Sequence, residues 1–145
     1  MGLFGSSGIR GIVNEKITPE LSRDIGRAVG EKAKEVIVGG DTRPTRDMVT
    51  SALISGLTAA GAEVKRAGMV PTPTLARAAS TFDCGVMVTA SHNPEQYNGI
   101  KLWNPDGSSF GTEQMKDIEE RIEDPEGLPS WEKVGKTSSY VGAVE

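Results

Sequence analysis

Gly-Val-Met-Val-Thr-Ala-Ser-His-Asn-Pro, residues 85–94, is the stretch that decides how this chain folds. The apolar run 85–88 predicts a buried strand that ends at Thr89, and Pro94 ends the regular structure after it. Ser91 therefore stands just beyond the carboxyl end of a strand, which is where open α/β sheets bind their ligands. The stretch thus predicts a buried strand followed by a polar loop at the edge of the sheet.

Outward from this stretch, strand and helix patterns alternate along the chain. Residues 3–13 are expected to form a loop that runs into a short strand. Further strands are expected at 36–38, 85–89 and 99–103, with a weaker one at 63–67. Helices are expected after Thr18, which is suited to cap a helix, and at 47–60, 71–79 and 112–125. This alternation predicts an α/β fold of three layers, α/β/α, around a mostly parallel mixed sheet of about four strands. Because Asn98-Gly99 favours a turn, we expect strand 99–103 to run antiparallel at an edge.

The composition is that of an ordinary globular domain, with 37% hydrophobic and 25% charged residues among 145. We expect residues 1–125 to form one α/β/α domain. From residue 126 onward, Gly, Pro and Ser recur without periodicity, so residues 126–145 are expected to be a linker towards an absent second domain.

Charge and hydropathy exclude several kinds of partner. A net charge of −4 argues against a general nucleic-acid binder, which normally carries a basic face. Neither a signal peptide nor a run of membrane-spanning length is found, so we expect a cytoplasmic protein without a membrane partner. The single cysteine, Cys84, rules out an internal disulfide and is expected to be a buried, inert thiol.

Four polar side chains are candidates for chemistry near the strand that ends at Thr89. Ser91 is either a turn residue or a nucleophile, although the Gly-x-Ser-x-Gly of triad hydrolases is absent. His92 follows it directly and points the opposite way on an extended segment, which favours a phosphate or sugar contact over a general base. Lys101, which the Asn-Gly turn is expected to bring back near Ser91, is either a solvated lysine or a phosphate and proton-transfer partner. Arg10 is either a surface arginine or a bidentate phosphate ligand. Together these groups suit phosphoryl transfer.

Asp41 and Arg43 follow another expected strand, 36–38, and so should lie at the same edge of the sheet as Ser91. They are expected either to place charge beside the site or to form an ion pair. We favour a structural ion pair.

These residues together resemble the α-D-phosphohexomutase family, which comprises phosphoglucomutases, phosphomannomutases and phosphoglucosamine mutases. The resemblance rests on four ordered motifs spread over about a hundred residues and is limited to the family's N-terminal domain. The motifs are Phe4-Gly-Ser-Ser-Gly-Ile-Arg10-Gly, Gly40-Asp-Thr-Arg43, Thr89-Ala-Ser-His-Asn-Pro94 and Asn98-Gly-Ile-Lys101.

The resemblance implies that Ser91 is a phosphoserine that exchanges phosphate with a hexose phosphate through a hexose 1,6-bisphosphate intermediate. It further implies that the phosphate on Ser91 ligates Mg²⁺, that Lys101 lies beside the phosphoserine, and that Arg10 and His92 contact substrate. The remaining Mg²⁺ ligands and the sugar-recognition loop of such enzymes lie in later domains. We therefore expect an excised or truncated first domain that does not complete turnover alone.

Two alternatives stay open at the level of sequence. A non-catalytic sugar-phosphate or anion-binding module would use the same strand-end loops without a covalent serine. A receiver-like domain phosphorylated on Asp41 is disfavoured, because the acidic cluster that such domains need for Mg²⁺ is missing. The sequence does not choose among glucose, mannose and glucosamine phosphates.

Overall fold

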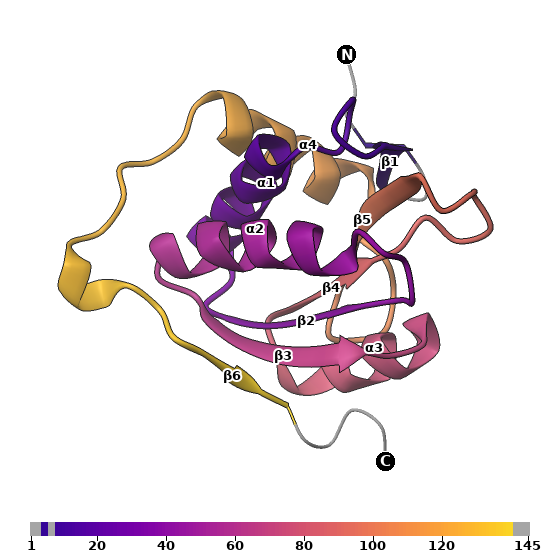
Figure 1. Cartoon of the computed structure of the whole chain (residues 1–145). Coiled ribbons are helices and arrows are strands. Elements are labelled where there is room, and N and C mark those ends of the chain that lie inside the picture. The colour runs from indigo at the N-terminus through magenta and orange to yellow at the C-terminus, as the bar shows by residue number, and fades with distance from the viewer. Residues whose placement is uncertain (1–3, 6–7, 141–145) are drawn as a thin grey trace.

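The computed structural model of the chain describes residues 4–5 and 8–140. Its strands are β1 (Ile9–Ile12), β2 (Glu35–Gly40), β3 (Glu63–Met69), β4 (Cys84–Val88), β5 (Tyr97–Trp103) and β6 (Thr137–Ser139). Its helices are α1 (Pro19–Lys32), α2 (Arg46–Ala59), α3 (Thr72–Ala78) and α4 (Thr112–Glu123), with 3-10 turns η1 (Ala79–Thr81) and η2 (Trp131–Lys133). Figure 1 shows the strands forming one sheet with helices on both sides, which confirms the predicted α/β class.

The ends of the first two helices follow from local chemistry. Thr18 caps α1 as predicted, because its Oγ1 accepts a hydrogen bond of 3.0 Å from the Leu21 N–H, and Pro19 begins the helix. Gly61 lies just beyond the C-terminal end of α2 and has φ +102°, a left-handed conformation that glycine adopts without strain. Among the described residues, no helix is both long and apolar enough to cross a membrane.

The sheet differs from the prediction in two respects. It has six strands rather than about four, in the order β1-β5-β4-β2-β3-β6. The antiparallel strand, β5, is not at an edge, because β1 pairs with its outer side and places Ile9 opposite Ile100. Strand β6 was missed because its three residues are too few for the alternation of side chains to identify it. The pairing of β1 with β5 joins segments that are far apart in the sequence, so local periodicity does not reveal it.

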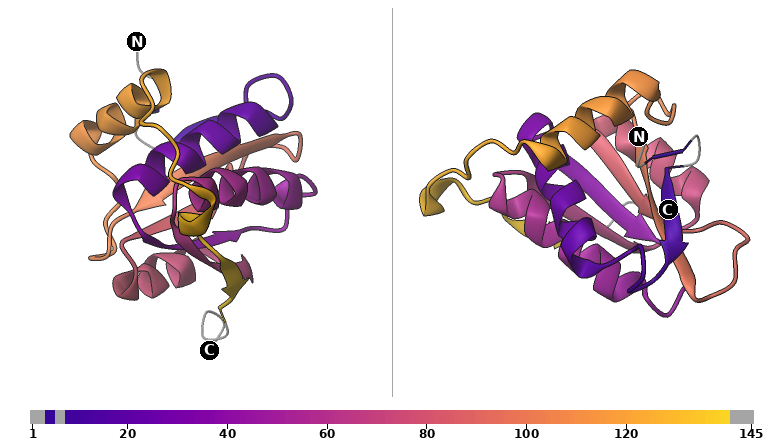
Figure 2. Two further views of the ribbon diagram at one scale, coloured as in Figure 1. Left: turned by 90° about the vertical axis from the view of Figure 1, so that its left-hand side faces the viewer. Right: turned by 90° about the horizontal axis from the view of Figure 1, so that it is seen from above.

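The sheet separates two apolar layers of unequal size. Helices α1, α2 and α4 cover one face, where residues such as Ile25, Leu53 and Ile118 pack against Val86 and Ile100. Helix α3 covers part of the other face, over β2 and β4, where Leu75 packs with the smaller cluster. Figure 2 shows these layers from the side and from above, and it shows the loop between β4 and β5 projecting from one end of the sheet. The predicted three-layer arrangement is confirmed.

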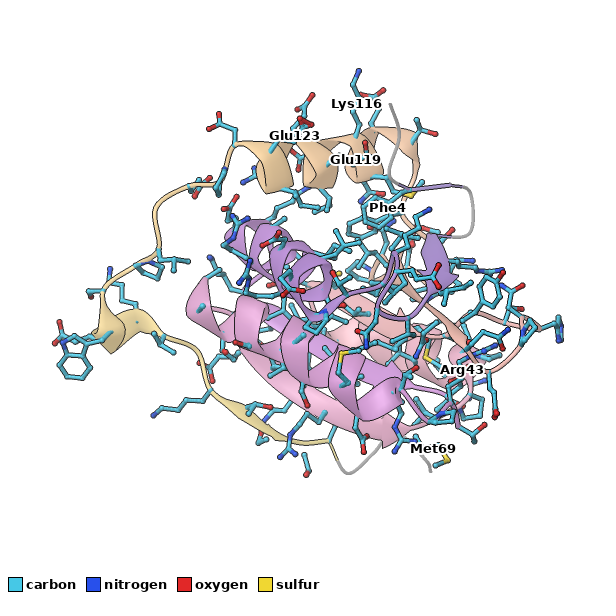
Figure 3. The ribbon with its side chains drawn as sticks, turned by 45° about the horizontal axis from the view of Figure 1, so that its top comes forward. Phe4, Arg43, Met69, Lys116, Glu119 and Glu123 are labelled. Carbon is cyan, nitrogen blue, oxygen red and sulfur yellow. The ribbon has the colours of Figure 1, made fainter. Side chains whose placement is uncertain are left out.

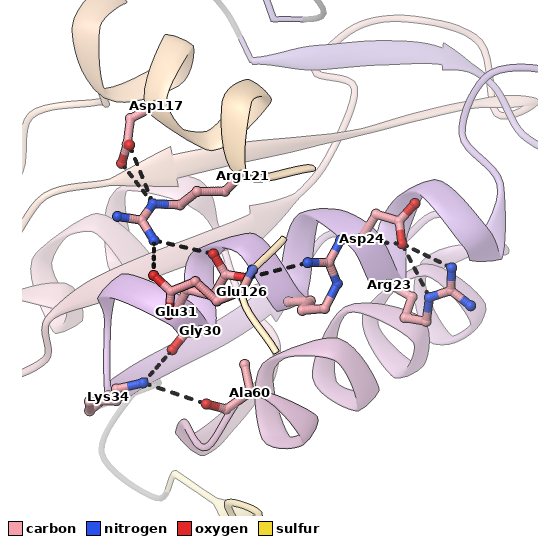
Figure 4. Close-up of polar contacts among 10 residues, drawn as sticks. Arg23, Asp24, Gly30, Glu31, Lys34, Ala60, Asp117, Arg121 and Glu126 are labelled. Atoms are coloured by element: carbon pink, nitrogen blue, oxygen red, sulfur yellow. Dashed lines mark hydrogen bonds and ion pairs between the residues drawn. The ribbon is translucent and has the colours of Figure 1, made fainter. Parts of the chain in front are cut away.

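An ion-pair network fixes the chain where it leaves α4 (Figure 4). Arg121 Nη1 lies 3.2 Å from Glu31 Oε1 on α1 and 3.1 Å from Glu126 Oε2. The Glu126 N–H also donates to Glu31 Oε2 at 3.0 Å, and Glu31 is almost wholly buried. Beside it, a hydrogen bond from Lys32 holds the pKa of Asp117 below its usual value. The segment that follows reaches β6, which pairs in parallel with β3. The linker role of residues 126–145 stays a prediction.

Candidate functional site

The candidate site begins at the end of β4, where the backbone leaves the sheet at Thr89. The Thr89 hydroxyl donates to Asp41 Oδ2 at 2.6 Å and accepts a hydrogen bond of 3.1 Å from the Ser91 N–H. Ser91 itself is exposed and has φ +58°, the left-handed region that non-glycine residues seldom adopt. Its side chain is thus presented to solvent at the carboxyl end of the central strands, as the sequence predicted.

Arg43 holds the serine loop in this conformation. Its Nη2 donates to the carbonyl oxygens of Ser91 and Asn93, both at 2.8 Å, and its Nη1 donates to those of Pro94 and Tyr97 at 2.7 and 3.0 Å. Its Nε lies 3.2 Å from Asp41 Oδ2. Figure 3 shows Arg43 beside the loop that joins β4 to β5.

These contacts decide between the two roles considered for Arg43. A guanidinium has five N–H groups, and here they reach four carbonyls and one carboxylate, so none is left for a ligand. The structural ion pair with Asp41 is therefore confirmed. The contacts to the loop carbonyls were missed from the sequence, although the position of Arg43 after a neighbouring strand end was a usable signal.

Arg10 and Lys101 lie on one face of the sheet, close to where the serine loop begins. Register places Arg10 opposite Gly99, and Lys101 follows two residues later on the same side of β5. This is the face that α3 covers in part, since the intervening Ile100 packs in the cluster on the opposite side. A side chain at position 99 would not fit, because a Cβ there would lie 2.9 Å from Arg10 Cγ and 2.8 Å from the Thr89 carbonyl oxygen.

Neither cation on this face has a carboxylate partner in the described part of the chain. The Arg10 Nε is buried and has no hydrogen-bond partner there. Two cations without carboxylate partners give this face of the sheet a local positive charge. The geometry therefore suits the binding of an anion.

In the structure, the ammonium of Lys101 contacts the ring of Trp103. Lys101 is opposite Met87 in the sheet, and its Nζ lies 4.8 Å from the centre of the Trp103 ring. Among the residues from 8 to 140, no hydrogen bond joins Lys101 or His92 to the Ser91 hydroxyl. His92 is exposed in the loop, where its side chain is accessible to a ligand. The roles of these residues in catalysis and substrate binding stay predictions.

The groups around Ser91 do not by themselves make a magnesium site. Asp41 is the carboxylate linked to the serine loop, and it is already bound by Arg43 and Thr89. Within the described ranges, no three His, Cys, Asp or Glu side chains gather in a way that could hold a metal ion. A phosphate on Ser91 would add oxygen ligands of the kind that Mg²⁺ prefers, but a full octahedral set needs more donors.

Comparison with known proteins relates the chain to one family. A family model described as "Phosphoglucomutase/phosphomannomutase, alpha/beta/alpha domain I" matches residues 1–127. The chain is 52% identical over 145 residues to the probable phosphoglucosamine mutase of Methanosarcina acetivorans, covering 99% of this chain and 33% of that protein. It is 48% identical over 147 residues to the phosphoglucosamine mutase of Methanococcus aeolicus, covering 100% of this chain and 32% of that protein. The chain thus spans about a third of the length of the curated relatives it matches.

Solved structures resemble the chain over most of its length. A phosphoglucomutase/phosphomannomutase family protein from Burkholderia thailandensis superposes with a TM-score of 0.81 at 32% identity, covering 95% of this chain and 32% of that one. A putative phosphomannomutase from Thermus thermophilus gives a TM-score of 0.78 at 33% identity, with coverage of 94% and 32%. The resemblance expected from the four motifs is confirmed. This chain belongs to the phosphoglucomutase/phosphomannomutase family, and it corresponds to the alpha/beta/alpha domain I of that family.

Proposed function

We propose that this chain is the phosphoserine-bearing first domain of a phosphohexomutase, an intramolecular phosphotransferase that interconverts hexose 1-phosphate and hexose 6-phosphate. One observation carries the proposal. An exposed serine at a strand end is fixed by a fully engaged arginine, next to a sheet face with two cations that lack carboxylate partners. A phosphorylated sugar and its bisphosphate are anions that such a face would bind.

The curated relatives support a narrower substrate. Those at 52% and 48% identity are named phosphoglucosamine mutases, which favours glucosamine phosphate over glucose or mannose phosphate. Because the chain spans about a third of their length, we propose that turnover needs the domains of a longer polypeptide. We propose the cytoplasm as the location, where sugar phosphates are made and used.

The proposed transfer has two half-reactions at Ser91. In the first, the bond between the Ser91 Oγ and phosphorus breaks while a bond forms between phosphorus and a sugar hydroxyl oxygen. The proton of that hydroxyl leaves to a base, and the Ser91 Oγ takes up a proton. The sugar is then a hexose 1,6-bisphosphate. In the second, the other phosphoryl group of the bisphosphate returns to Ser91 by the reverse steps, so that the enzyme is regenerated.

The residues of this chain would divide the work by charge and reach. The Lys101 ammonium would neutralise the phosphoryl group during transfer and is the candidate for moving a proton at the Ser91 Oγ. The Arg10 guanidinium would bind a phosphate oxygen with its free donors. His92, exposed in the loop, would contact the sugar or its phosphate. Arg43 would keep the Ser91 backbone in place without touching substrate.

Mg²⁺ would neutralise charge on the phosphoryl group when it is bound. The phosphate on Ser91 is the one ligand that this chain is expected to supply. The other ligands are proposed to come from a different domain, in line with the incomplete donor set around Ser91.

The test is to locate the phosphate. The protein would be isolated from its own cells, incubated with glucosamine 1,6-bisphosphate and digested with trypsin. Residues 78–101 then form one peptide, which contains Ser80, Thr81, Thr89 and Ser91. Fragmentation of this peptide is expected to assign the phosphate to Ser91. A tagged Ser91→Ala variant made in the same cells should carry none, whereas Ser80→Ala, which alters another exposed serine of the peptide, should be labelled normally.

Other outcomes point to the alternatives. Phosphate that hydroxylamine releases would indicate an acyl phosphate on an aspartate such as Asp41 and would overturn the proposal. Reversible sugar-phosphate binding that Ser91→Ala leaves unchanged, with no labelled serine, would favour the anion-binding module. Labelling should slow by about a hundredfold in Lys101→Ala, as expected for loss of an acid–base or charge partner. The matched change Lys65→Ala, at an exposed position of β3, should leave the rate unchanged.

A further inference from the structure

Lys101 and Trp103 form a cation–π pair on the sheet face that also carries Arg10. The two residues are separated by one position on β5, so their side chains project from the same side of the strand. The Lys101 Nζ lies 4.8 Å from the centre of the indole ring, within the roughly 6 Å over which an ammonium is attracted to an aromatic face.

The indole of Trp103 is held in place by apolar packing. Trp103 packs against the apolar cluster beneath α3, which includes Met87 and Ala79. Register puts Trp103 opposite Gly85, where a Cβ would lie 2.9 Å from the Cβ of Ala79 and 3.6 Å from that of Trp103, so this part of the sheet is closely packed. The Trp103 Nε1 is buried and has no hydrogen-bond partner within the described ranges, so apolar packing rather than a polar contact holds the ring.

The pair draws Lys101 away from the serine loop. Trp103 lies at the end of β5, whereas the loop adjoins the beginning of that strand, where Arg43 binds the carbonyls of Tyr97 and Ser91. No carboxylate in the described part of the chain pairs with Lys101, and the contact of its ammonium on this face is with the indole of Trp103. Without the indole, the ammonium would be free to sample the space between Arg10 and Ser91.

We propose that Trp103 is a positioning residue for Lys101: its indole holds the ammonium withdrawn towards the end of β5 until a phosphate on Ser91 attracts it. The inference rests on the proposed function, because it takes Ser91 as the phosphate carrier. A phosphoserine dianion competes with the ring for the ammonium, since a charge-assisted contact is stronger than a cation–π contact. Lys101 therefore has two positions, one on the indole and one at the phosphate.

Nuclear magnetic resonance of the chain with ¹³C-labelled lysines tests the first position. The Lys101 ε-CH₂ protons, assigned by the loss of their signal in Lys101→Arg, should be shifted upfield by the indole ring current and show nuclear Overhauser effects to it. Trp103→Leu should abolish the upfield shift, and Trp103→Phe should retain part of it. Trp131→Leu is the matched control, because Trp131 is 83% exposed and lies on η2. An unshifted Lys101 signal in the unaltered chain would overturn the proposal even if Trp103→Leu failed to fold.

Phosphoserine installed genetically at position 91 tests the second position. The Lys101 protons should then lose most of their upfield shift, while the shift should persist with serine at that position. An upfield shift that phosphoserine leaves unchanged would contradict the competition. Because the phosphate is installed rather than transferred from a sugar, this result does not depend on the labelling experiment. If phosphoserine abolishes the upfield shift but the chain takes no phosphate from glucosamine 1,6-bisphosphate, the two positions of Lys101 would be supported and the proposed mutase function would be contradicted.

Discussion

Arg43 determines the shape of the serine loop although it was not among the residues expected to carry the chemistry. Its side chain is 8% exposed, and its guanidinium donates to four backbone carbonyls between Ser91 and Tyr97. Backbone carbonyls in a loop have no partner on a neighbouring strand, so the planar guanidinium donates the hydrogen bonds that such a strand would otherwise supply. The strained backbone at Ser91, with φ +58°, is held by these bonds.

Arg43→Ala should therefore lower the free energy of unfolding by about 2–3 kcal/mol, since it removes charged hydrogen bonds and leaves Asp41 without its cation. Urea denaturation followed by circular dichroism measures the change. Arg43→Lys should recover only part of the loss, because an ammonium cannot reach four carbonyls in a plane. The control is Arg77→Ala at an exposed position of α3, which should change stability by less than about 0.5 kcal/mol. Equal effects of Arg43→Ala and Arg77→Ala would contradict the role given to Arg43.

Cys84 is buried, as expected from the sequence, and the inertness of its thiol stays a prediction. It is buried at the start of β4, and burial raises the pKa of its thiol from 9.0 to about 12. At pH 8 the folded chain should resist iodoacetamide, whereas the urea-unfolded chain should react.

The same shift gives a stability difference at alkaline pH. Unfolding releases the thiol proton between pH 9.0 and about 12, so this contribution is intact below pH 9.0 and declines as the pH rises towards 12. Its slope is about 1.4 kcal/mol per pH unit. Between pH 9.0 and about 12, the free energy of unfolding of Cys84→Ala should therefore fall less steeply than that of the unaltered chain, by about 1.4 kcal/mol per pH unit. Urea titrations at several pH values measure the two slopes. Parallel pH profiles for the two proteins would argue against the shift.

At the scale of elements, the contact between α1 and α2 is unusually close. A Cβ on Gly56 of α2 would lie 2.1 Å from the Arg23 carbonyl oxygen of α1, and one on Gly26 would lie 2.2 Å from that of Leu53. Two glycines thus face the backbone of the opposite helix, which brings the helices together above β2 and β4. The loop that carries Asp41 and Arg43 leads directly into α2, so the contact between the two helices also helps to position these two residues.

Gly56→Ala should therefore destabilise the chain by about 1–3 kcal/mol, because the added methyl group must push the helices apart. In a solvent-exposed helix the same change would stabilise by about 1 kcal/mol, so the sign of the effect is diagnostic. Thermal unfolding of the variant beside Ser55→Ala, an exposed neighbour on α2, separates packing from helix propensity. Ser55→Ala should be neutral or slightly stabilising, and a stabilised Gly56→Ala would show that the helices can separate without loss.

The elements that could be predicted from the sequence are those with a sustained hydrophobic pattern or with residues typical of helix ends. Thr18 and Gly61 mark helix ends by chemistry that acts within a few residues. The strand β4 is buried on both faces and reads as an apolar run. By contrast, β6 is exposed along its whole length, and it is held by pairing with β3 and not by its own pattern. Pairing between distant segments is not encoded in local periodicity, which is why the strand count was too low.

At the scale of the whole molecule, the site joins three parts of the sequence that are far apart: β1, the loop after β2, and the serine loop with the strand β5 that follows it. The sequence located each segment through its motif and placed the serine correctly at a strand end. The direction of the Lys101 side chain could not be predicted, because it depends on a contact with Trp103 that no motif indicates. Nor could the carbonyl contacts of Arg43 be predicted, since these depend on the path of the loop. The sequence thus predicted which residues form the site, but not how their side chains are arranged relative to one another.

If these segments form one anion site, phosphate should stabilise the folded chain through Arg10 and Lys101, the two cations that lack carboxylate partners. A ligand that binds only the folded state at about ten times its Kd adds about 1.4 kcal/mol, which for a chain of this size raises Tm by roughly 3–6 °C. Differential scanning fluorimetry with inorganic phosphate, at ionic strength matched by sodium chloride, measures the shift. Arg10→Ala and Lys101→Ala should each remove most of it, whereas Lys65→Ala on β3 should retain it. A shift of equal size in all three variants would mean that phosphate acts through general exclusion from the surface, and the proposed anion site would then have no support from binding.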